Sequence, residues 1–215
     1  MAGGALSGTP IIVVTGAIAS GKSTVAEVMA DAGGILLHAD SLAHGALEDK
    51  EVIEKIRSEF GESAMSGPDR ISRGGLGRLV LGEPGQMEKL NRIVTPAVTW
   101  IIERAVTDAA REAGYIVLDA VLFFKYTFQF RADIVIATEA SEQVRVERLM
   151  ARDGLGRKQA LARVTSQRYL YPGWKKSDMI IDTEMEIEEL TERAIEIRDR
   201  ILEEILKEGS GGYNG

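Results

Sequence analysis

The sequence predicts an α/β fold in which a five-stranded parallel sheet is flanked by helices. Short apolar runs rich in β-branched residues indicate strands that are buried on both faces. These runs alternate with segments of helical periodicity, an order typical of a parallel sheet covered by helices. With 215 residues, 45% of them hydrophobic, the chain is long enough to form one globular domain with a full core.

Five segments are predicted to be strands, and the regions between them to be mostly helical. The strands are expected at 11–14, 35–37, 115–119, 133–138 and 179–182. The helices are expected at 24–32, 48–60, 76–81, 86–113 with an interruption at Pro96, and 184–207. Because no strand pattern occurs between Ser41 and Gly114, a long helical insertion is expected between two strands of the sheet.

Composition excludes several classes of protein. Cysteine is absent, so the chain has no disulfides, no thiolate metal site and no cysteine nucleophile. No apolar run approaches the roughly 20 residues of a membrane span, and the first eight residues do not resemble a signal peptide. The net charge of −7 argues against nucleic acid as the main partner. We therefore expect a cytoplasmic protein without a membrane or nucleic-acid partner, and the sequence leaves its oligomeric state open.

The first predicted strand leads into a glycine-rich segment, 16–23, that matches the pattern G-x-x-x-x-G-K-[ST]. In this pattern the backbone N–H groups and the start of the following helix surround a chain of phosphates. The lysine, Lys22, reaches the β- and γ-phosphates, and the hydroxyl of Ser23 is a ligand for Mg²⁺. The alternative is a glycine-rich turn with an exposed lysine. The residues expected to bind ATP here are Gly16, Ala17, Ile18, Ala19, Ser20, Gly21, Lys22, Ser23 and Thr24.

Two aspartates follow predicted strands and are expected near the phosphates, because the carboxyl ends of parallel strands face the ligand crevice. Asp40, after the second strand, is predicted to be a general base that accepts the proton of an attacking hydroxyl. The alternative role for Asp40 is a helix N-cap. Asp119, at the end of the third strand, is expected to hold Mg²⁺ through water or to contact the substrate. His38 and His44 flank Asp40 and are assigned to local packing and hydrogen bonding.

A basic segment, 145–176, carries nine Lys or Arg residues and two acidic ones in an otherwise acidic chain. Within it Arg148 and Arg152 are one helical turn apart, so both can face the phosphates together. Arginine suits this role because its planar group donates two hydrogen bonds to phosphate oxygens. The segment is therefore predicted to be a lid over the phosphates, with a solvated basic surface as the alternative.

The order of these features favours a kinase among proteins with such a loop. A GTPase should contain an N-K-x-D motif, and the sequence has none. The strand after the loop helix leads directly to Asp40, and the Arg-rich segment comes late in the chain. In a kinase, positioning and electrostatics supply most of the catalysis, which these residue types can provide.

With these motifs in place, the chain resembles the dephospho-coenzyme A kinase family over roughly 10–190. The matching stretches are T-G-x-I-x-S-G-K-S-T at 15–24, A-D-S-L-A at 39–43, Ser72-Arg73, V-L-D at 117–119 with L-F-F at 122–124, E-R-L-M-A-R-D-G-L at 147–155, Ser166-Gln167 and D-x-I-I-D at 178–182. The stretch at 147–155 is the most specific of them, since the glycine-rich loop alone would fit many kinases.

The resemblance implies a P-loop kinase fold and transfer of the γ-phosphate of ATP, with Mg²⁺, to the ribose 3′-hydroxyl of dephospho-CoA. This reaction is the last step of coenzyme A synthesis. Carried over, Asp40, Lys22 and Arg148 are catalytic, Arg152 binds ATP, and Arg73 with Asp40 and Asp119 binds the substrate. One domain over 9–208 is expected, made of a core (9–44, 114–143 and 177–208), a helical substrate insertion (45–113) and a lid (144–176). The ends, 1–8 and 209–215, are expected to be disordered.

The chain departs from the family pattern at several positions, most of them on the substrate side. These positions are Ala17, Ala19, His38, His44, Thr95, Val121, Lys125 and Thr183. Two alternatives therefore stay open. One is a kinase for another small alcohol or nucleoside, and the other is a regulator that binds nucleotide without catalysis.

Overall fold

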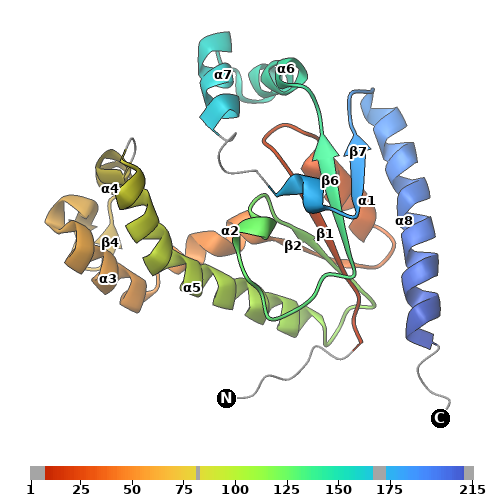
Figure 1. Cartoon of the computed structure of the whole chain (residues 1–215), viewed down its shortest axis with the longest axis horizontal. Coiled ribbons are helices and arrows are strands. Elements are labelled where there is room, and N and C mark those ends of the chain that lie inside the picture. The colour runs from red at the N-terminus through yellow and green to blue at the C-terminus, as the bar shows by residue number, and fades with distance from the viewer. Residues whose placement is uncertain (1–7, 81–82, 167–172, 211–215) are drawn as a thin grey trace. The chain divides into compact units, whose positions relative to one another are not determined.

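The computed structural model describes residues 8–80, 83–166 and 173–210, which form two compact units. One unit contains Met1–His38 and Val106–Gly215, and the other contains Ala39–Ala105. The first unit holds the large sheet, and the second is mostly helical (Figure 1). The predicted substrate insertion covered a similar part of the chain, 45–113.

The first unit is built on a five-stranded parallel sheet with the strand order β2-β5-β1-β6-β7. The strands are β1 (Ile11–Gly16), β2 (Ile35–His38), β5 (Ile116–Asp119), β6 (Ile134–Glu139) and β7 (Met179–Asp182). Every residue of β1 and β5 is buried, which explains why both strands read as continuous apolar runs. The predicted α/β fold with five parallel strands is confirmed.

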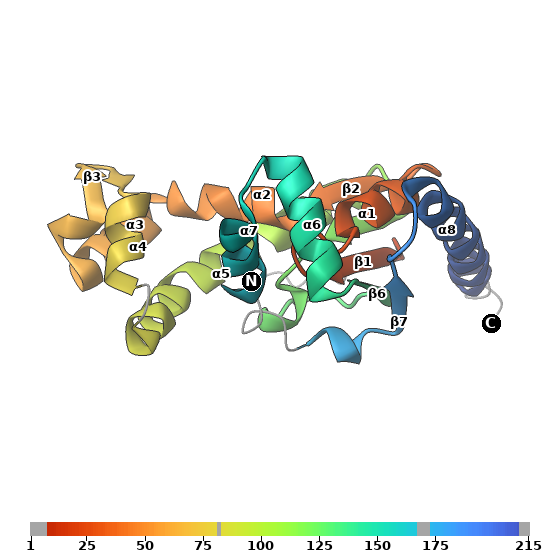
Figure 2. The same cartoon turned by 90° about the horizontal axis from the view of Figure 1, so that it is seen from above.

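The described part of this unit includes the helices α1 (Lys22–Ala30), α6 (Glu142–Asp153), α7 (Arg157–Ser166) and α8 (Ile187–Ser210). Helix α1 packs on α8, and both cover one face of the sheet. The shared core includes Ile12 and Val14 from β1, Met29 from α1 and Leu190 from α8. Figure 2 shows α6 beside α7, and these two helices form a second, smaller core.

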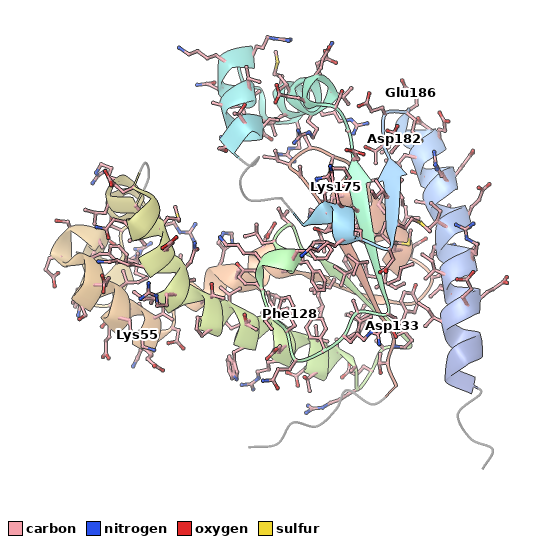
Figure 3. The ribbon with its side chains drawn as sticks, in the orientation of Figure 1. Lys55, Phe128, Asp133, Lys175, Asp182 and Glu186 are labelled. Atoms are coloured by element: carbon pink, nitrogen blue, oxygen red, sulfur yellow. The ribbon has the colours of Figure 1, made fainter. Side chains whose placement is uncertain are left out.

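Aspartate carboxylates at the amino ends of two strands help to set their register. Asp133, labelled in Figure 3, accepts a hydrogen bond of 2.7 Å from the backbone N–H of Ile11, directly before β6 begins. Asp178 accepts one of 2.8 Å from the backbone N–H of Val135 in the same way, directly before β7. Each aspartate thus satisfies a backbone donor of the neighbouring strand that the sheet ladder does not pair.

The second unit contains α2 (Ala39–His44), α3 (Lys50–Phe60), α4 (Arg73–Val80) and most of α5 (Pro84–Ala109). Its core is formed by apolar residues of α3, α4 and α5, such as Ile56 and Leu76. The expectation of no strand in this region is wrong, because β3 (Met65–Gly67) pairs with β4 (Arg70–Ile71) in an antiparallel hairpin. The hairpin is too short to show an alternating apolar pattern.

The interruption expected at Pro96 is not observed, since α5 runs continuously through this residue. Proline removes one N–H, so the carbonyl of Arg92, four residues earlier, loses its helical partner. Both Arg92 and Pro96 are exposed, so water can replace the missing hydrogen bond. A proline on the solvent side of a helix is therefore tolerated here.

The remaining differences concern the ends of elements. Helix α8 reaches Ser210, beyond its predicted end, so two residues of the tail expected to be disordered are helical. Residues 1–7 and 211–215 of the predicted disordered ends lie outside the described residues, as do Gln167 and Arg168 of the lid. Among the helices of the described part of the chain, none has the length and apolar character needed to cross a membrane.

Candidate active site

The glycine-rich loop connects the carboxyl end of β1 to the first turn of α1, as the sequence predicts. Gly16 ends β1 opposite Thr138 of β6, and a side chain at Gly16 would collide with the Thr138 and Ser20 hydroxyls. Those two hydroxyls are 2.7 Å apart and buried. Only glycine leaves room for this contact, which fixes the start of the loop against the neighbouring strand.

The loop closes through two residues in the left-handed region of backbone conformation. Ala19 has φ of 60° and Gly21 has φ of 79°. Gly21 is the N-cap of α1, and no side chain caps this helix. The first N–H groups of α1 therefore have no side-chain acceptor and remain oriented toward the loop, an arrangement that binds phosphate.

Lys22, the first residue of α1, forms an ion pair with Asp119 at the end of β5. The Lys22 side chain is 10% exposed and that of Asp119 is 5% exposed. Buried charges of this kind are tolerated when they are paired, so removal of either group would leave the other without its counter-charge. The structure thus brings together the predicted phosphate-binding lysine and one predicted substrate or metal residue.

Asp119 has a second partner that the sequence did not reveal. The imidazole Nδ1 of His38 lies 3.1 Å from Asp119 Oδ2. His38 and Asp119 are opposite one another in the parallel pairing of β2 with β5. Which strands pair with one another cannot be read from a single segment of sequence. For this reason the sequence predicted only local packing and hydrogen bonding for His38.

Arg148 of α6 reaches the loop between β7 and α8. Its guanidinium donates to the carbonyl and the hydroxyl of Thr183, the latter at 3.0 Å, and approaches the Ala19 carbonyl at 3.5 Å. The Thr183 hydroxyl is also 2.9 Å from the carbonyl of Ser20, and Thr183 is fully buried. Arg148 is thus connected to the phosphate loop through Thr183, a residue whose role the sequence did not indicate.

Arg152 does not share partners with Arg148 in the described structure. It is exposed and pairs with Asp153, with 2.7 Å between Nε and Oδ1, while Asp153 also accepts from Arg163 of α7 at 2.9 Å. The hydrogen bond from Arg152, together with the charge of Arg163, lowers the pKa of the Asp153 carboxyl below its ordinary value. These contacts hold the turn between α6 and α7.

The two helices of the lid also have an apolar base. Val146 and Leu149 of α6 pack against Ala160 and Val164 of α7, and Ile18 and Ala19 of the phosphate loop lie against this cluster. The predicted lid is therefore in contact with the loop through apolar side chains as well as through Arg148.

Asp40 and Arg73 belong to the second unit, whereas the phosphate loop belongs to the first. Asp40 is exposed and lies in the first turn of α2, two residues after the end of β2. Arg73, at the start of α4, lines a pocket of about 590 Å³ together with His44, Arg70 and Ser72. Pockets of this size accommodate small ligands, and the arginines here suit an anionic one.

The donor set in the first unit is suited to Mg²⁺ rather than to a transition metal. Ser23 presents an exposed hydroxyl in the first turn of α1, and Asp119 supplies carboxylate oxygens near Lys22. Within the part of the chain that the structure describes, no group of three or more His, Asp or Glu residues could hold a metal alone. Mg²⁺ commonly takes few protein oxygens and completes its coordination with phosphates and water, which agrees with this set.

Comparison with known proteins identifies the family. A family model described as dephospho-CoA kinase matches residues 10–189. The chain belongs to the dephospho-CoA kinase family. A relative from Carboxydothermus hydrogenoformans, named dephospho-CoA kinase, is 33% identical over 190 residues, which cover 87% of this chain and 92% of that protein.

Two solved structures are similar over nearly the whole chain. One, from Thermus thermophilus, has a TM-score of 0.69 at 30% identity and covers 96% of this chain and 99% of that one. The dephospho-CoA kinase from Campylobacter jejuni has a TM-score of 0.57 at 26% identity, with 91% and 98% covered. The fold is that of the P-loop kinases, and the family resemblance found in the sequence motifs is confirmed.

Proposed function

We propose that this protein phosphorylates the ribose 3′-hydroxyl of dephospho-CoA with ATP to give coenzyme A and ADP. The observation that carries the proposal is the phosphate loop with its Lys22–Asp119 pair, in a chain that matches the dephospho-CoA kinase family over 10–189. Together with this reaction, we propose the role that the sequence predicts for each part of the chain. The core binds ATP, the insertion binds the acceptor, and the lid covers the phosphates.

The loop residues Gly16–Thr24 position the triphosphate. Their backbone N–H groups and the uncapped start of α1 surround the β- and γ-phosphates. Lys22 leaves Asp119 and neutralises charge on the group that is transferred. When bound, Mg²⁺ would be held by Ser23 and, through water, by Asp119, where it would neutralise phosphate charge.

Asp40 is proposed to be the general base. Its carboxylate orients the acceptor hydroxyl and takes its proton as the bond to phosphorus forms. Asp40 is exposed at the start of α2 and is thus available to a substrate. Replacement by asparagine keeps the size but removes the base, so Asp40→Asn should lower kcat while ATP affinity stays nearly unchanged.

The pocket of the second unit is proposed to bind the acceptor. Arg73 and Arg70 line it, and dephospho-CoA carries a pyrophosphate that arginine can grip through two donors. Arg73→Gln should therefore raise the KM for the acceptor and leave the KM for ATP unchanged. Arg78→Gln is a matched control, because Arg78 is exposed on the same helix but does not line the pocket.

The experiment that tests the function is ATP turnover against a panel of acceptors. The panel contains dephospho-CoA, pantetheine, nucleosides, nucleoside monophosphates and shikimate. We expect phosphorylation of dephospho-CoA with the highest kcat/KM and its loss in Asp40→Asn. A higher kcat/KM for another alcohol would replace the acceptor in this proposal. Nucleotide binding without turnover of any acceptor would instead indicate a regulator on the same fold.

A further inference from the structure

We propose that His38 is a positioning residue for nucleotide binding: it keeps the buried Asp119 carboxylate paired when Lys22 moves from Asp119 to the phosphates. This inference rests on the proposed use of ATP at the phosphate loop. It concerns a residue that does not itself touch the nucleotide and acts through Asp119.

The sheet places His38 beside Asp119. The two residues are register partners at the carboxyl ends of β2 and β5, and side chains of such partners lie on the same face of a sheet. The imidazole Nδ1 is 3.1 Å from Asp119 Oδ2, while Asp119 Oδ1 pairs with Lys22. A carboxylate only accepts hydrogen bonds, so Nδ1 of His38 is the donor. Each oxygen of Asp119 thus has its own partner.

His38 and Asp119 differ in burial. Asp119 is 4% exposed as a whole residue, whereas the His38 side chain is 46% exposed. His38 can therefore keep its contact with Asp119 without giving up its own access to water. Asp119 is almost cut off from water, so its polar contacts within the protein come from Lys22 and His38.

Nucleotide binding changes the partners of Asp119. In this motif the lysine reaches the β- and γ-phosphates, so Lys22 must leave Asp119 when they bind. In the absence of Mg²⁺ and without another donor, Asp119 would then be a buried charge with no partner, and the cost of that state would oppose binding. The hydrogen bond from His38 persists through the exchange and reduces this cost. The histidine therefore makes the release of Lys22 easier.

The test is calorimetric titration with ADP in the presence of EDTA, so that no metal contributes. ADP carries the β-phosphate that Lys22 contacts. We expect His38→Ala to weaken ADP binding roughly tenfold, the loss typical for a hydrogen bond to a charged group. His38→Asn should stay within about threefold of the wild type, because its amide nitrogen can donate to Asp119 from a similar position.

A double-mutant cycle separates this role from a merely structural one. In the Asp119→Asn background no buried carboxylate is left behind when Lys22 moves, so adding His38→Ala should no longer weaken ADP binding. Melting temperatures of all variants, measured alongside, verify that each is folded. A tenfold loss that persists in the Asp119→Asn background would assign His38 a structural role and overturn the inference.

The outcomes also distinguish this inference from the proposed function. If the wild-type chain does not bind ADP, the use of ATP is wrong and the inference falls with it. If the wild type binds ADP and His38→Ala binds it equally well, the inference alone is wrong.

Discussion

At the scale of single residues, the Lys22–Asp119 pair affects both the stability of the fold and the proposed catalysis. Both side chains are almost completely buried, so removal of one leaves the other without a counter-charge. The two groups must nevertheless separate for Lys22 to reach phosphate. A mutation that removes one member of such a pair lowers the free energy of unfolding, and this loss can be measured separately from catalytic activity.

We predict that Lys22→Met destabilises the fold by about 2 kcal/mol, because the Asp119 carboxylate keeps only its hydrogen bond to His38. The double variant Lys22→Met/Asp119→Asn should recover most of this loss. Both variants should lose turnover by orders of magnitude, since neither supplies the lysine charge to the transferred group. Denaturant unfolding and kcat measured on the same preparations check both parts. An equally unstable double variant would show that the loss comes from something other than the unpaired Asp119.

Single residues also show which features can be predicted from the sequence and which cannot. Gly16, Lys22 and Ser23 were predicted because their spacing is local and the pattern has a known chemistry. The contact between His38 and Asp119 depends on which strands are neighbours, and their positions in the sequence are 81 residues apart. Strand order is decided by packing of the whole sheet, so no local pattern could have revealed it.

At the scale of elements, the turn between β7 and α8 connects the phosphate loop to α6. Thr183 has its hydroxyl 2.9 Å from the Ser20 carbonyl and 3.0 Å from Nη1 of Arg148, and it is fully buried. The apolar cluster of α6 and α7 contacts the same loop. The lid helices therefore contact the phosphate loop and Thr183 through Arg148 and through one apolar cluster.

We predict that Thr183→Val lowers the unfolding free energy by about 2 kcal/mol, because valine has a similar shape but leaves buried polar groups without a partner. Thr191→Val is the control. Thr191 donates to the Ile187 carbonyl of its own helix near the surface, so its loss should cost less than about 0.5 kcal/mol. Chemical denaturation of both variants makes the comparison. Similar losses in the two would mean that the Thr183 contacts add nothing to stability.

The turn between α6 and α7 gives a prediction on pH. The pKa of Asp153 is lowered, chiefly by the hydrogen bond from Arg152, so its folded-state pKa lies below its unfolded one. The contribution of Asp153 to the stability of the fold is therefore complete above the ordinary aspartate pKa of about 3.9, and it is lost as the pH falls through the folded-state pKa. The melting-temperature difference between wild type and Asp153→Asn should be equal at pH 5 and pH 8. A difference that changes between these values would contradict the assigned pairing.

Elements were predicted where their apolar pattern is long enough. The five strands of the large sheet are nearly all apolar, and α8 shows a regular stripe, so their existence followed from composition and periodicity. The hairpin of β3 and β4 has strands of three and two residues, which is shorter than any periodicity can indicate. The continuity of α5 at Pro96 depends on exposure to water, which the sequence does not contain.

At the scale of the whole molecule, charge is distributed unevenly. The chain has a net charge of −7, yet 145–176 contains nine basic and two acidic residues. Part of this segment is held without ligand, because Leu149 is fully buried and Arg148 is bound to Thr183. The basic side chains of α7 include Arg157, Lys158 and Arg163, all exposed. Bound nucleotide would supply the counter-charge that this region lacks.

We therefore predict that nucleotide and acceptor together increase amide protection in the lid, and more in α7 than in α6. Helix α6 is anchored to Thr183 through Arg148, whereas α7 is held by its apolar contacts with α6 and by the Arg163–Asp153 pair. The remaining basic side chains of α7, Arg157 and Lys158, are exposed like charges that phosphates would attract. Hydrogen exchange with and without a non-hydrolysable ATP analogue and dephospho-CoA measures this, with α8 as the internal reference. Arg148→Lys keeps the charge but loses the two-donor grip, so kcat should fall much more than ATP affinity. Equal protection of α7 in both states would mean that the basic segment is a solvated surface rather than a lid.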